Sequence, residues 1–292
     1  MNLKNFVPKI ILPLTILLII LSFSTLIFSK YFFIFDLFSH FQLQYLLLLC
    51  IIAIISIFYK NFIILIIAFS YSIFLGNLVF PATFISENIK PDIFYMNTYY
   101  YTEKHEQIVK EILKNSTDIV FLVEANKSLI SELTTQLKDP IIELNEGPNS
   151  FVLFSKIKAE EVKVHNETIP KFISAKFPEF TLIGLHAMDP ITPEKRQINL
   201  QYFSQINDYI NSLEGEKFII VGDFNNTIFS GTFRKHFQKY FEKNNYTWGT
   251  LKPWYIPIDH ALANFPINIA ITKKMESDHK GLLIDTKTKT YK

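Results

Sequence analysis

Three long stretches without a charged residue lie near the amino terminus. They run from Lys9 to Lys30, from His40 to Lys60 and from Lys60 to Glu87, and no Lys, Arg, Asp or Glu lies between these bounding residues. Each stretch is rich in Ile, Leu and Phe and has close to the ~20 residues that a helix needs to cross the ~30 Å hydrocarbon core of a bilayer. A backbone in lipid must satisfy its own hydrogen bonds, so these stretches are confined to helices.

The alternative interpretation of these stretches is a cleaved signal peptide followed by buried core helices. No small-residue cleavage pattern follows the first stretch and two further stretches come after it, so membrane helices are favoured. The chain is 49% apolar with a mean hydropathy of +0.20, and the excess is concentrated in this region. We therefore predict a membrane region with three transmembrane helices over residues 1–84 and a globular domain over residues 85–292.

The lysines that flank these stretches favour one orientation in the membrane. Lys4, Lys9 and Lys60 fall on one side, and Lys30 falls on the other side together with Asp36. Because loops rich in Lys and Arg stay in the cytoplasm, the amino terminus is expected inside. An odd number of helices then places the globular domain outside the cytoplasm.

Composition excludes some classes of chemistry for the globular domain. The single cysteine, Cys50, lies in the second uncharged stretch, so the rest of the chain has no thiol for a disulfide, a zinc thiolate site or a cysteine nucleophile. Residues 1–84 hold four of the 29 Lys and Arg residues and one of the 27 Asp and Glu residues, which leaves 25 basic and 26 acidic residues. The domain therefore lacks the basic excess that is usual for a protein that grips long duplex DNA.

After about residue 90, short apolar runs alternate with amphipathic segments, which is typical of an α/β domain in which helices cover sheets. Thr102 is expected to cap a helix that runs through Lys114, and Thr192-Pro193-Glu194 is a strong start signal for another helix. Further helices are predicted at 127–137 and 230–243, and strands at 92–96, 118–123, 150–155, 172–177, 180–186, 218–221, 260–263 and 267–272.

Polar residues that can bind a cation or move a proton stand at the ends of several apolar runs. In chain order they are Asn97, Glu124, His186, Asp223, Asn225, Asp259, Asp278 and His279. Acidic, amide and imidazole groups gathered at strand ends are what a metal-assisted attack of water on a phosphate ester requires. Carboxylate and amide oxygens without cysteine favour a hard cation, Mg²⁺ or Mn²⁺, over zinc.

In this order, Gly-Asp-Phe-Asn at 222–225 and Ser-Asp-His at 277–279 resemble the endonuclease/exonuclease/phosphatase superfamily, which includes pancreatic deoxyribonuclease, apurinic endonucleases, inositol polyphosphate 5-phosphatases and bacterial sphingomyelinases. The resemblance covers about residues 90–288. It is closest to a bacterial branch with a short hydrophobic amino-terminal region, in which Pro-Ile-Asp-His, here at 257–260, precedes Ser-Asp-His. It implies an α/β four-layer sandwich of two mixed β-sheets flanked by helices. Taken with the uncharged stretches and the flanking lysines, it predicts a multi-pass protein of the bacterial cytoplasmic (inner) membrane with its catalytic domain outside the cytoplasm.

The resemblance also implies a metal site. Glu124 is the expected principal ligand of Mg²⁺ or Mn²⁺, with Asn97 beside it and Asp278 completing the coordination sphere. The alternative for Glu124 is a surface residue that caps the following helix, and the alternative for Asn97 is a turn residue. The position of Glu124 directly after the apolar run favours a ligand carried to the edge of a sheet.

Catalytic roles follow from the same resemblance. Asp223 is expected to orient or deprotonate the attacking water, and Asn225 to hold a phosphate oxygen. His279 is the expected catalytic imidazole, paired with Asp259, and His186 matches the histidine that contacts phosphate or protonates the leaving group in deoxyribonuclease-like members. The alternatives are an ordinary Gly-Asp turn at Asp223 and, for the histidines, satisfied core or surface residues.

The predicted function is that of a membrane-tethered, divalent-metal-dependent phosphoester hydrolase, an endonuclease-like phosphodiesterase. One alternative is a phosphodiesterase or phosphatase directed at lipid or inositol phosphates, so the candidate substrates are nucleic acid and a phospholipid head group. A second alternative is a non-catalytic binding protein on the same fold, although every expected position is filled. Trp248, Trp254 and Tyr255 are able to stack on bases, to touch lipid or simply to pack, and do not decide between these functions.

Overall fold

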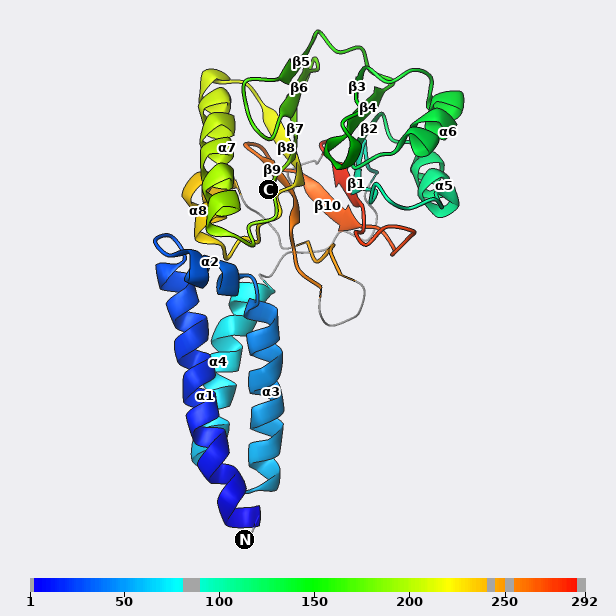
Figure 1. Ribbon diagram of the computed structural model, residues 1–292. Coiled ribbons are helices and arrows are strands. Elements are labelled where there is room, and N and C mark those ends of the chain that lie inside the picture. Colours follow the sequence, from blue (N-terminus) through cyan, green and yellow to red (C-terminus); the bar gives the residue numbers. More distant parts are fainter. Residues whose placement is uncertain (1–2, 81–89, 241–244, 250–254, 288–292) are drawn as a thin grey trace. The chain divides into compact units, whose positions relative to one another are not determined.

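Figure 1 shows the computed structural model, which describes residues 3–80, 90–240, 245–249 and 255–287. Contacts divide the chain into two compact units. The first unit comprises Met1–Thr83 together with the segment Thr227–Lys235, and the second comprises Phe84–Asn226 and His236–Lys292. A short piece of the later chain therefore groups with the amino-terminal helices.

Three long apolar helices form the body of the first unit. They are α1 (Leu3–Phe28), α3 (Gln42–Phe58) and α4 (Phe62–Val79), which pack side by side, and the short α2 (Phe33–Ser39) precedes α3. The apolar part of α1 and the whole of α4 are each long and apolar enough to cross a membrane, and α2 and α3 together qualify as a third span although they meet at a bend of 64°. The described helices thus offer two spans, or three if the bent pair is one.

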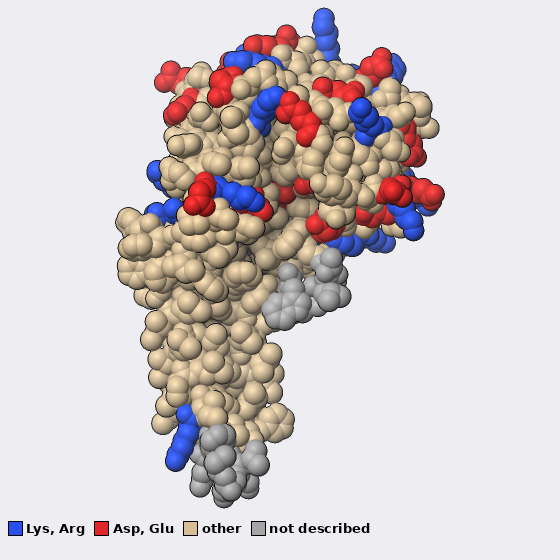
Figure 2. Space-filling model, viewed as in Figure 1, with Lys and Arg blue, Asp and Glu red and all other residues tan. Residues whose placement is uncertain are grey.

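The outer surface of this helical unit is apolar. Phe58, Ile63 and Ile66 are examples, with 80%, 70% and 63% of their surfaces exposed. Figure 2 shows almost no charged side chain on the visible side of the bundle, whereas charges of both signs are interspersed over the second unit. A large exposed apolar surface is what helices that face lipid require.

Two mixed β-sheets build the second unit. The strand orders are β10-β11-β1-β2-β4-β3 and β5-β6-β7-β8-β9, and each sheet contains one parallel pair, β1 with β2 and β7 with β8. The bounds are β1 Ile93–Asn97, β2 Ile119–Val123, β3 Ile142–Leu144, β4 Phe151–Ser155, β5 Glu161–His165, β6 Phe172–Lys176, β7 Thr181–His186, β8 Phe218–Asp223, β9 Asp259–Ala263, β10 Asn268–Ile271 and β11 Leu282–Asp285.

Alternation along the strands sorts the side chains into layers. In β1, Tyr95 joins the core between the two sheets, whereas Phe94 joins the core beneath α5 (Glu106–Asn115) and α6 (Lys127–Leu137). The other sheet is covered by α7 (Pro193–Ser212), whose Tyr202 packs against Phe172. Because both faces of each sheet are covered, the strands read as almost continuous apolar runs. The predicted α/β sandwich of two mixed sheets between helices is confirmed.

Local predictions were wrong where a distant part of the chain decides the structure. Thr102 does not cap the first helix, since α5 begins at Glu106 and the carboxylate of Glu276 accepts hydrogen bonds from the backbone nitrogens of Gln107 and Ile108. The helix predicted at 230–243 is shorter, with α8 at Gly231–Phe237 followed by a 3₁₀ turn at Gln238–Tyr240, and its predicted end lies outside the described residues. The structure adds β3, β5, β11 and a 3₁₀ turn at Gly147–Asn149.

Gly222 is required by a close approach between strands. It is the register partner of Leu185 in the parallel β7–β8 pair, and a Cβ atom added to it would lie 2.0 Å from the Leu185 carbonyl oxygen. No rotamer relieves a clash of Cβ with backbone. The glycine of the Gly-Asp-Phe-Asn element therefore keeps the two parallel strands in register.

We expect Gly222→Ala to destabilise the folded chain by about 2 kcal/mol or more, because it overpacks a buried strand pair against backbone. Gly76→Ala in α4 is the matched control, since a methyl group added there meets no atom within 4 Å. Thermal unfolding of both variants in detergent, followed by circular dichroism, measures the difference. Equal melting temperatures for Gly222→Ala and the wild type would contradict this role of Gly222.

Candidate active site

The two parallel strand pairs deliver polar side chains to one cluster. Asn97 ends β1 and Glu124 follows β2, while His186 and Asp223 end β7 and β8 as direct register partners. Asp259 begins β9 opposite Asp223. The carboxyl ends of parallel strands lie at the same edge of a sheet, so the sandwich collects these groups from distant parts of the sequence.

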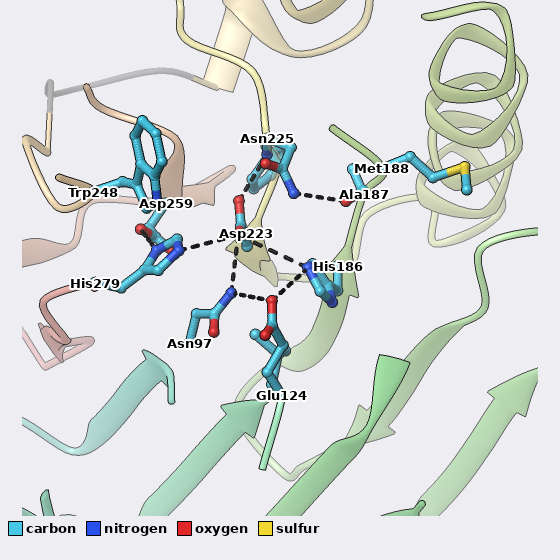
Figure 3. Close-up of polar contacts among 12 residues, drawn as sticks. Asn97, Glu124, His186, Ala187, Met188, Asp223, Asn225, Trp248, Asp259 and His279 are labelled. Carbon is cyan, nitrogen blue, oxygen red and sulfur yellow. Dashed lines mark hydrogen bonds and ion pairs between the residues drawn. The ribbon is translucent and has the colours of Figure 1, made fainter. Parts of the chain in front are cut away.

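All eight residues that the sequence singled out lie in this cluster, each within a hydrogen bond or an ion-pair distance of another member. Figure 3 labels all of them except Asp278. Their roles stay predictions, but their convergence is a structural finding. We call the set the rim cluster: Asn97, Glu124, His186, Asp223, Asn225, Asp259, Asp278 and His279.

Asn97 connects two carboxylates of the rim cluster. Its Nδ2 donates to Glu124 Oε1 at 2.9 Å and to Asp223 Oδ2 at 3.1 Å. Its Oδ1 accepts from the backbone nitrogen of Tyr99 at 3.0 Å, which defines the orientation of the amide. Ser277 Oγ donates to the Asn97 carbonyl oxygen at 2.8 Å. The serine of the Ser-Asp-His element therefore ties the end of the chain to β1.

A buried ion pair holds the imidazole of His279. Its Nδ1 lies 2.7 Å from Asp259 Oδ2, and both groups are almost inaccessible to solvent. Burial by itself lowers the pKa of His279, but the charge of Asp259 and its hydrogen bond, followed by the charges of Asp223 and Asp278, raise it to about 9. His279 therefore carries a proton at neutral pH, and its Nε2 lies 3.8 Å from Asp223 Oδ2.

Asp259 is satisfied on both oxygens. Tyr95 donates its hydroxyl to Oδ1 at 2.8 Å, and Thr247 donates its hydroxyl to Oδ2 at 2.5 Å. Burial alone raises the pKa of Asp259, but His279 and these hydrogen bonds outweigh burial and lower it. Tyr95 and Thr247 were not predicted from the sequence. A signal was present only for Tyr95, which is a polar-tipped residue two positions before Asn97 in an otherwise apolar strand.

Asp223 is the carboxyl group with the most unusual acidity. Its Oδ1 accepts from the backbone nitrogen of Asn225 at 2.8 Å, and its Oδ2 lies 3.9 Å from His186 Nε2. Burial, followed by the charge of Asp259, raises the pKa of Asp223 to about 8. At neutral pH this group is therefore mainly protonated, and in its ionised form it is a stronger base than an ordinary carboxylate, which suits removal of a proton from water.

His186 lies on the opposite side of Asp223 from His279 (Figure 3). Its Nε2 is 3.4 Å from Glu124 Oε1, and burial lowers its pKa in spite of that carboxylate. Its Nδ1 is buried without a hydrogen-bond partner among the described residues. The rim cluster therefore pairs a protonated imidazole at His279 with a neutral one at His186.

Two members of the rim cluster have left-handed backbone conformations. Glu124 has φ 54° and Asn225 has φ 49°, each just after a strand ends. This conformation is unusual for glutamate and costs of order 1–3 kcal/mol when the surroundings enforce it. Asn225 donates from Nδ2 to the Ala187 carbonyl oxygen at 2.8 Å, so its turn is fastened to the end of β7.

The carboxylate oxygens of Glu124 and Asp278 are of the kind that a hard divalent cation prefers. Trp248 Nε1 donates to Asp278 Oδ2 at 3.0 Å, whereas the buried Asp278 Oδ1 has no hydrogen-bond partner in the described part of the chain. Asp223, Asp259 and His279 also bring ligand atoms within 4.8 Å of one another. That trio suits a cation poorly, because Asp259 is saturated with donors and His279 is protonated.

Other residues near the rim cluster have structural contacts. His260 Nε2 lies 2.9 Å from the Asn226 carbonyl oxygen, and burial lowers the pKa of His260 to about 4. Lys280 Nζ lies 3.8 Å from the ring centre of Tyr255, so that ring is already occupied. Trp254 lies outside the described residues.

A cavity of about 260 Å³ opens beside His186. Its lining is mainly apolar, with Lys171 and Glu146 paired at 2.5 Å. The residues that line it include Phe151, Ile169, Pro170 and Met188. The cavity provides room next to the rim cluster for an uncharged organic group of modest size.

Comparison with solved structures finds the same fold in enzymes that act on DNA. An AP endonuclease from Archaeoglobus fulgidus aligns with a TM-score of 0.55 at 16% identity over 67% of this chain and 99% of that one. TDP2 from D. rerio, complexed with single strand DNA product, aligns with a TM-score of 0.53 at 14% identity over 66% of this chain and 96% of that one. The 3' phosphatase NExo from Neisseria, bound to product DNA hairpin, aligns with a TM-score of 0.52 at 13% identity over 66% of this chain and 98% of that one. At these identities the likeness shows the fold alone.

Comparison of sequences adds the family. No curated protein sequence matches the chain. The model of the Endonuclease/Exonuclease/phosphatase family matches residues 96–279, which is more than half of the chain. Because this match covers more than half of the chain and includes every residue of the rim cluster, the chain belongs to the endonuclease/exonuclease/phosphatase family.

Proposed function

We propose that the chain is a divalent-metal-dependent phosphodiesterase, endonuclease-like in its chemistry, whose catalytic domain (residues 85–292) is tethered to a membrane by residues 1–84. The observation that carries the proposal is the rim cluster, in which the carboxyl group of Asp223, the protonated imidazole of His279 and the Asp278 Oδ1 atom, which lacks a hydrogen bond among the described residues, converge. A scaffold protein without activity would have no need to bury these charges together. Membership of the family and the fold shared with phosphoester hydrolases support the same reaction.

Each residue of the rim cluster has a role in this proposal. Asp223 accepts a proton from the attacking water, and Asn225 orients a phosphate oxygen. His279, protonated and held by Asp259, donates to the phosphate as negative charge develops, and His186 lies where a leaving oxygen can be contacted. The proposal therefore assigns the base to Asp223 and the acid to His279, whose side chains lie 3.8 Å apart beside the phosphate that they would act on.

The cation would be held by Glu124 and Asp278, with Asn97 beside them, and the oxygen-rich donor set suits Mg²⁺ or Mn²⁺. When bound, it would neutralise phosphate charge and favour the ionised form of Asp223. Asn97 orients Glu124 whether or not its own oxygen is a ligand, because its Nδ2 already donates to that carboxylate.

Two substrate classes have separate support. Nucleic acid is supported by the AP endonuclease, and by the DNA products in the similar structures of TDP2 and NExo. A lipid head group or inositol phosphate is supported by the near-neutral globular domain, by the apolar cavity beside His186 and by the apolar helices. A panel of single-stranded and duplex DNA, RNA, sphingomyelin, inositol phosphates and aryl phosphodiesters, assayed with the full chain in nanodiscs, distinguishes the two classes.

The flanking lysines support a location in the bacterial cytoplasmic membrane with the catalytic domain outside the cytoplasm. Lys4, Lys9 and Lys60 then lie on the cytoplasmic side. A carboxyl-terminal fusion to a phosphatase reporter that is active only outside the cytoplasm tests this orientation.

We expect Glu124→Gln, Asp223→Asn and His279→Ala each to lower kcat by roughly 10²- to 10⁴-fold, the range of a positioned acid–base group. The exposed Asp139, which lies outside the rim cluster, provides a matched control, and Asp139→Asn is expected to keep wild-type turnover. Steady-state hydrolysis of an aryl phosphodiester measures the effect, with circular dichroism to verify folding. Wild-type turnover by folded His279→Ala would end the proposed mechanism.

Removal of divalent cations is expected to abolish hydrolysis, and Mg²⁺ or Mn²⁺ to restore it, because oxygen ligands bind hard cations. Calorimetric titration with Mn²⁺ is expected to show tighter binding to the wild type than to Glu124→Gln. Full turnover in the presence of a chelator would contradict metal dependence.

His279 is expected to make stability depend on pH. Its pKa is about 9 in the folded protein and 6.5 for an unperturbed histidine, so the folded state holds this proton more tightly. The stabilisation is therefore complete below pH 6.5 and is lost as the pH rises through about 9. With a chelator present, the wild type should have a higher melting temperature than His279→Gln, and this difference should be largest below pH 6.5. A gap that widens as the pH rises would contradict this assignment.

A further inference from the structure

Asp36 is a buried carboxylate far in sequence from the rim cluster. It is the one acidic residue among residues 1–84, and only 2% of its surface is exposed. Within the first unit, its Oδ1 accepts from Ser230 Oγ and from the backbone nitrogen of Gly231, both at 2.8 Å, and its Oδ2 accepts from Thr232 Oγ1 at 2.6 Å. An unpaired buried carboxylate costs several kcal/mol, so these donors make the burial tolerable.

Further contacts in the first unit hold the same segment, Thr227–Lys235. His40 Nδ1 accepts from the backbone nitrogen of Thr227 at 3.2 Å. Arg234 Nη2 donates to Ser29 Oγ at 2.7 Å and to a carbonyl oxygen of α1. A Cβ atom added to Gly231 would lie 2.3 Å from the backbone nitrogen of Lys30, so the two backbones are in close contact. We call Ser29, Asp36 and His40, which hold this segment, the segment clamp.

The clamped segment continues directly from the catalytic turn. Thr227 follows Asn226, which in turn follows Asp223-Phe224-Asn225. The turn is fastened in the second unit by β8 at its start and by His260 at the Asn226 carbonyl oxygen. After Asn226, the backbone nitrogen of Thr227 donates to His40, and Ser230, Gly231 and Thr232 donate to Asp36. The left-handed conformation of Asn225 needs restraint on both sides to persist.

We propose that Asp36 is a positioning residue for catalysis: by holding residues 230–232, it restrains the chain that leaves Asp223 and Asn225, so the amino-terminal helices contribute to turnover as well as to anchoring. This role rests on the proposed function. Catalytic groups tolerate little displacement, since a misplacement of about 1 Å costs roughly 10²-fold in rate. A carboxylate that served only to pack the helices would find donors within the helices themselves.

The test uses the full chain in nanodiscs and compares three variants. Asp36→Ala removes the hydrogen bonds that Ser230, Gly231 and Thr232 donate to the carboxylate. Asp36→Asn keeps the shape, because its oxygen can accept from Ser230 and Gly231 while its amide donates to the Thr232 hydroxyl. Gln42→Ala is the matched control, since Gln42 is buried and its side-chain amide is hydrogen-bonded to Ser22 and Thr25 of α1.

Two readouts are needed. Aryl phosphodiester hydrolysis is expected to show kcat lowered about 10- to 100-fold in Asp36→Ala with KM close to the wild-type value, rescue in Asp36→Asn, and wild-type turnover in Gln42→Ala. Limited trypsin digestion is expected to cut Asp36→Ala after Arg234 or Lys235 faster than the other two variants, because release of the segment exposes those bonds.

Each result separates the inference from the proposed function. Equal kcat for Asp36→Ala and Gln42→Ala, in a wild-type protein that hydrolyses the ester, overturns the positioning role alone. Unchanged trypsin cleavage of Asp36→Ala overturns the clamp itself. A wild-type protein that hydrolyses no ester with Mg²⁺ or Mn²⁺ overturns the proposed function and the catalytic role of Asp36 with it, while digestion still reports whether Asp36 holds the segment.

Discussion

Parallel pairing of two strands in each sheet is the constraint on which the candidate site depends. The β1–β2 pair delivers Asn97 and Glu124, and the β7–β8 pair delivers His186 opposite Asp223. A shift of one residue in either pair would turn these side chains to the other face of their sheet. Gly222 protects the second register, because only a residue without Cβ fits against the carbonyl oxygen of Leu185.

This arrangement buries several charged groups, which is energetically unfavourable, and neighbouring side chains compensate those charges with hydrogen bonds and opposite charge. Asp259 has hydrogen bonds from Tyr95, Thr247 and His279, so it stays ionised and keeps His279 protonated. The negative charge of Asp223 is compensated less fully by its neighbours, so burial raises its pKa to about 8. Different surroundings thus shift the pKa values of two aspartates on neighbouring strands in opposite directions, which suits Asp259 to orienting His279 and Asp223 to the proposed role of base.

The amino-terminal helices also contain a buried charge that is compensated by hydrogen bonds. Their one acidic side chain, Asp36, is buried, and its two oxygens accept hydrogen bonds from the segment that follows the turn at Asp223–Asn226. If the segment clamp acts as inferred, detaching the helices would change turnover and not only location. Anchoring and catalysis would then be properties of one cooperative structure, because the same short stretch of chain belongs to both.

The sequence by itself determined the apolar helices, most strands of the sandwich and the membership of the rim cluster, because hydrophobic periodicity and short motifs are local signals. It did not reveal Tyr95 and Thr247 behind Asp259, the cap that Glu276 provides to α5, or the partners of Asp36. Those contacts join residues far apart in the chain. Tertiary structure alone decided them, and with them the pKa values, because burial and neighbouring charge exist only once the chain is folded.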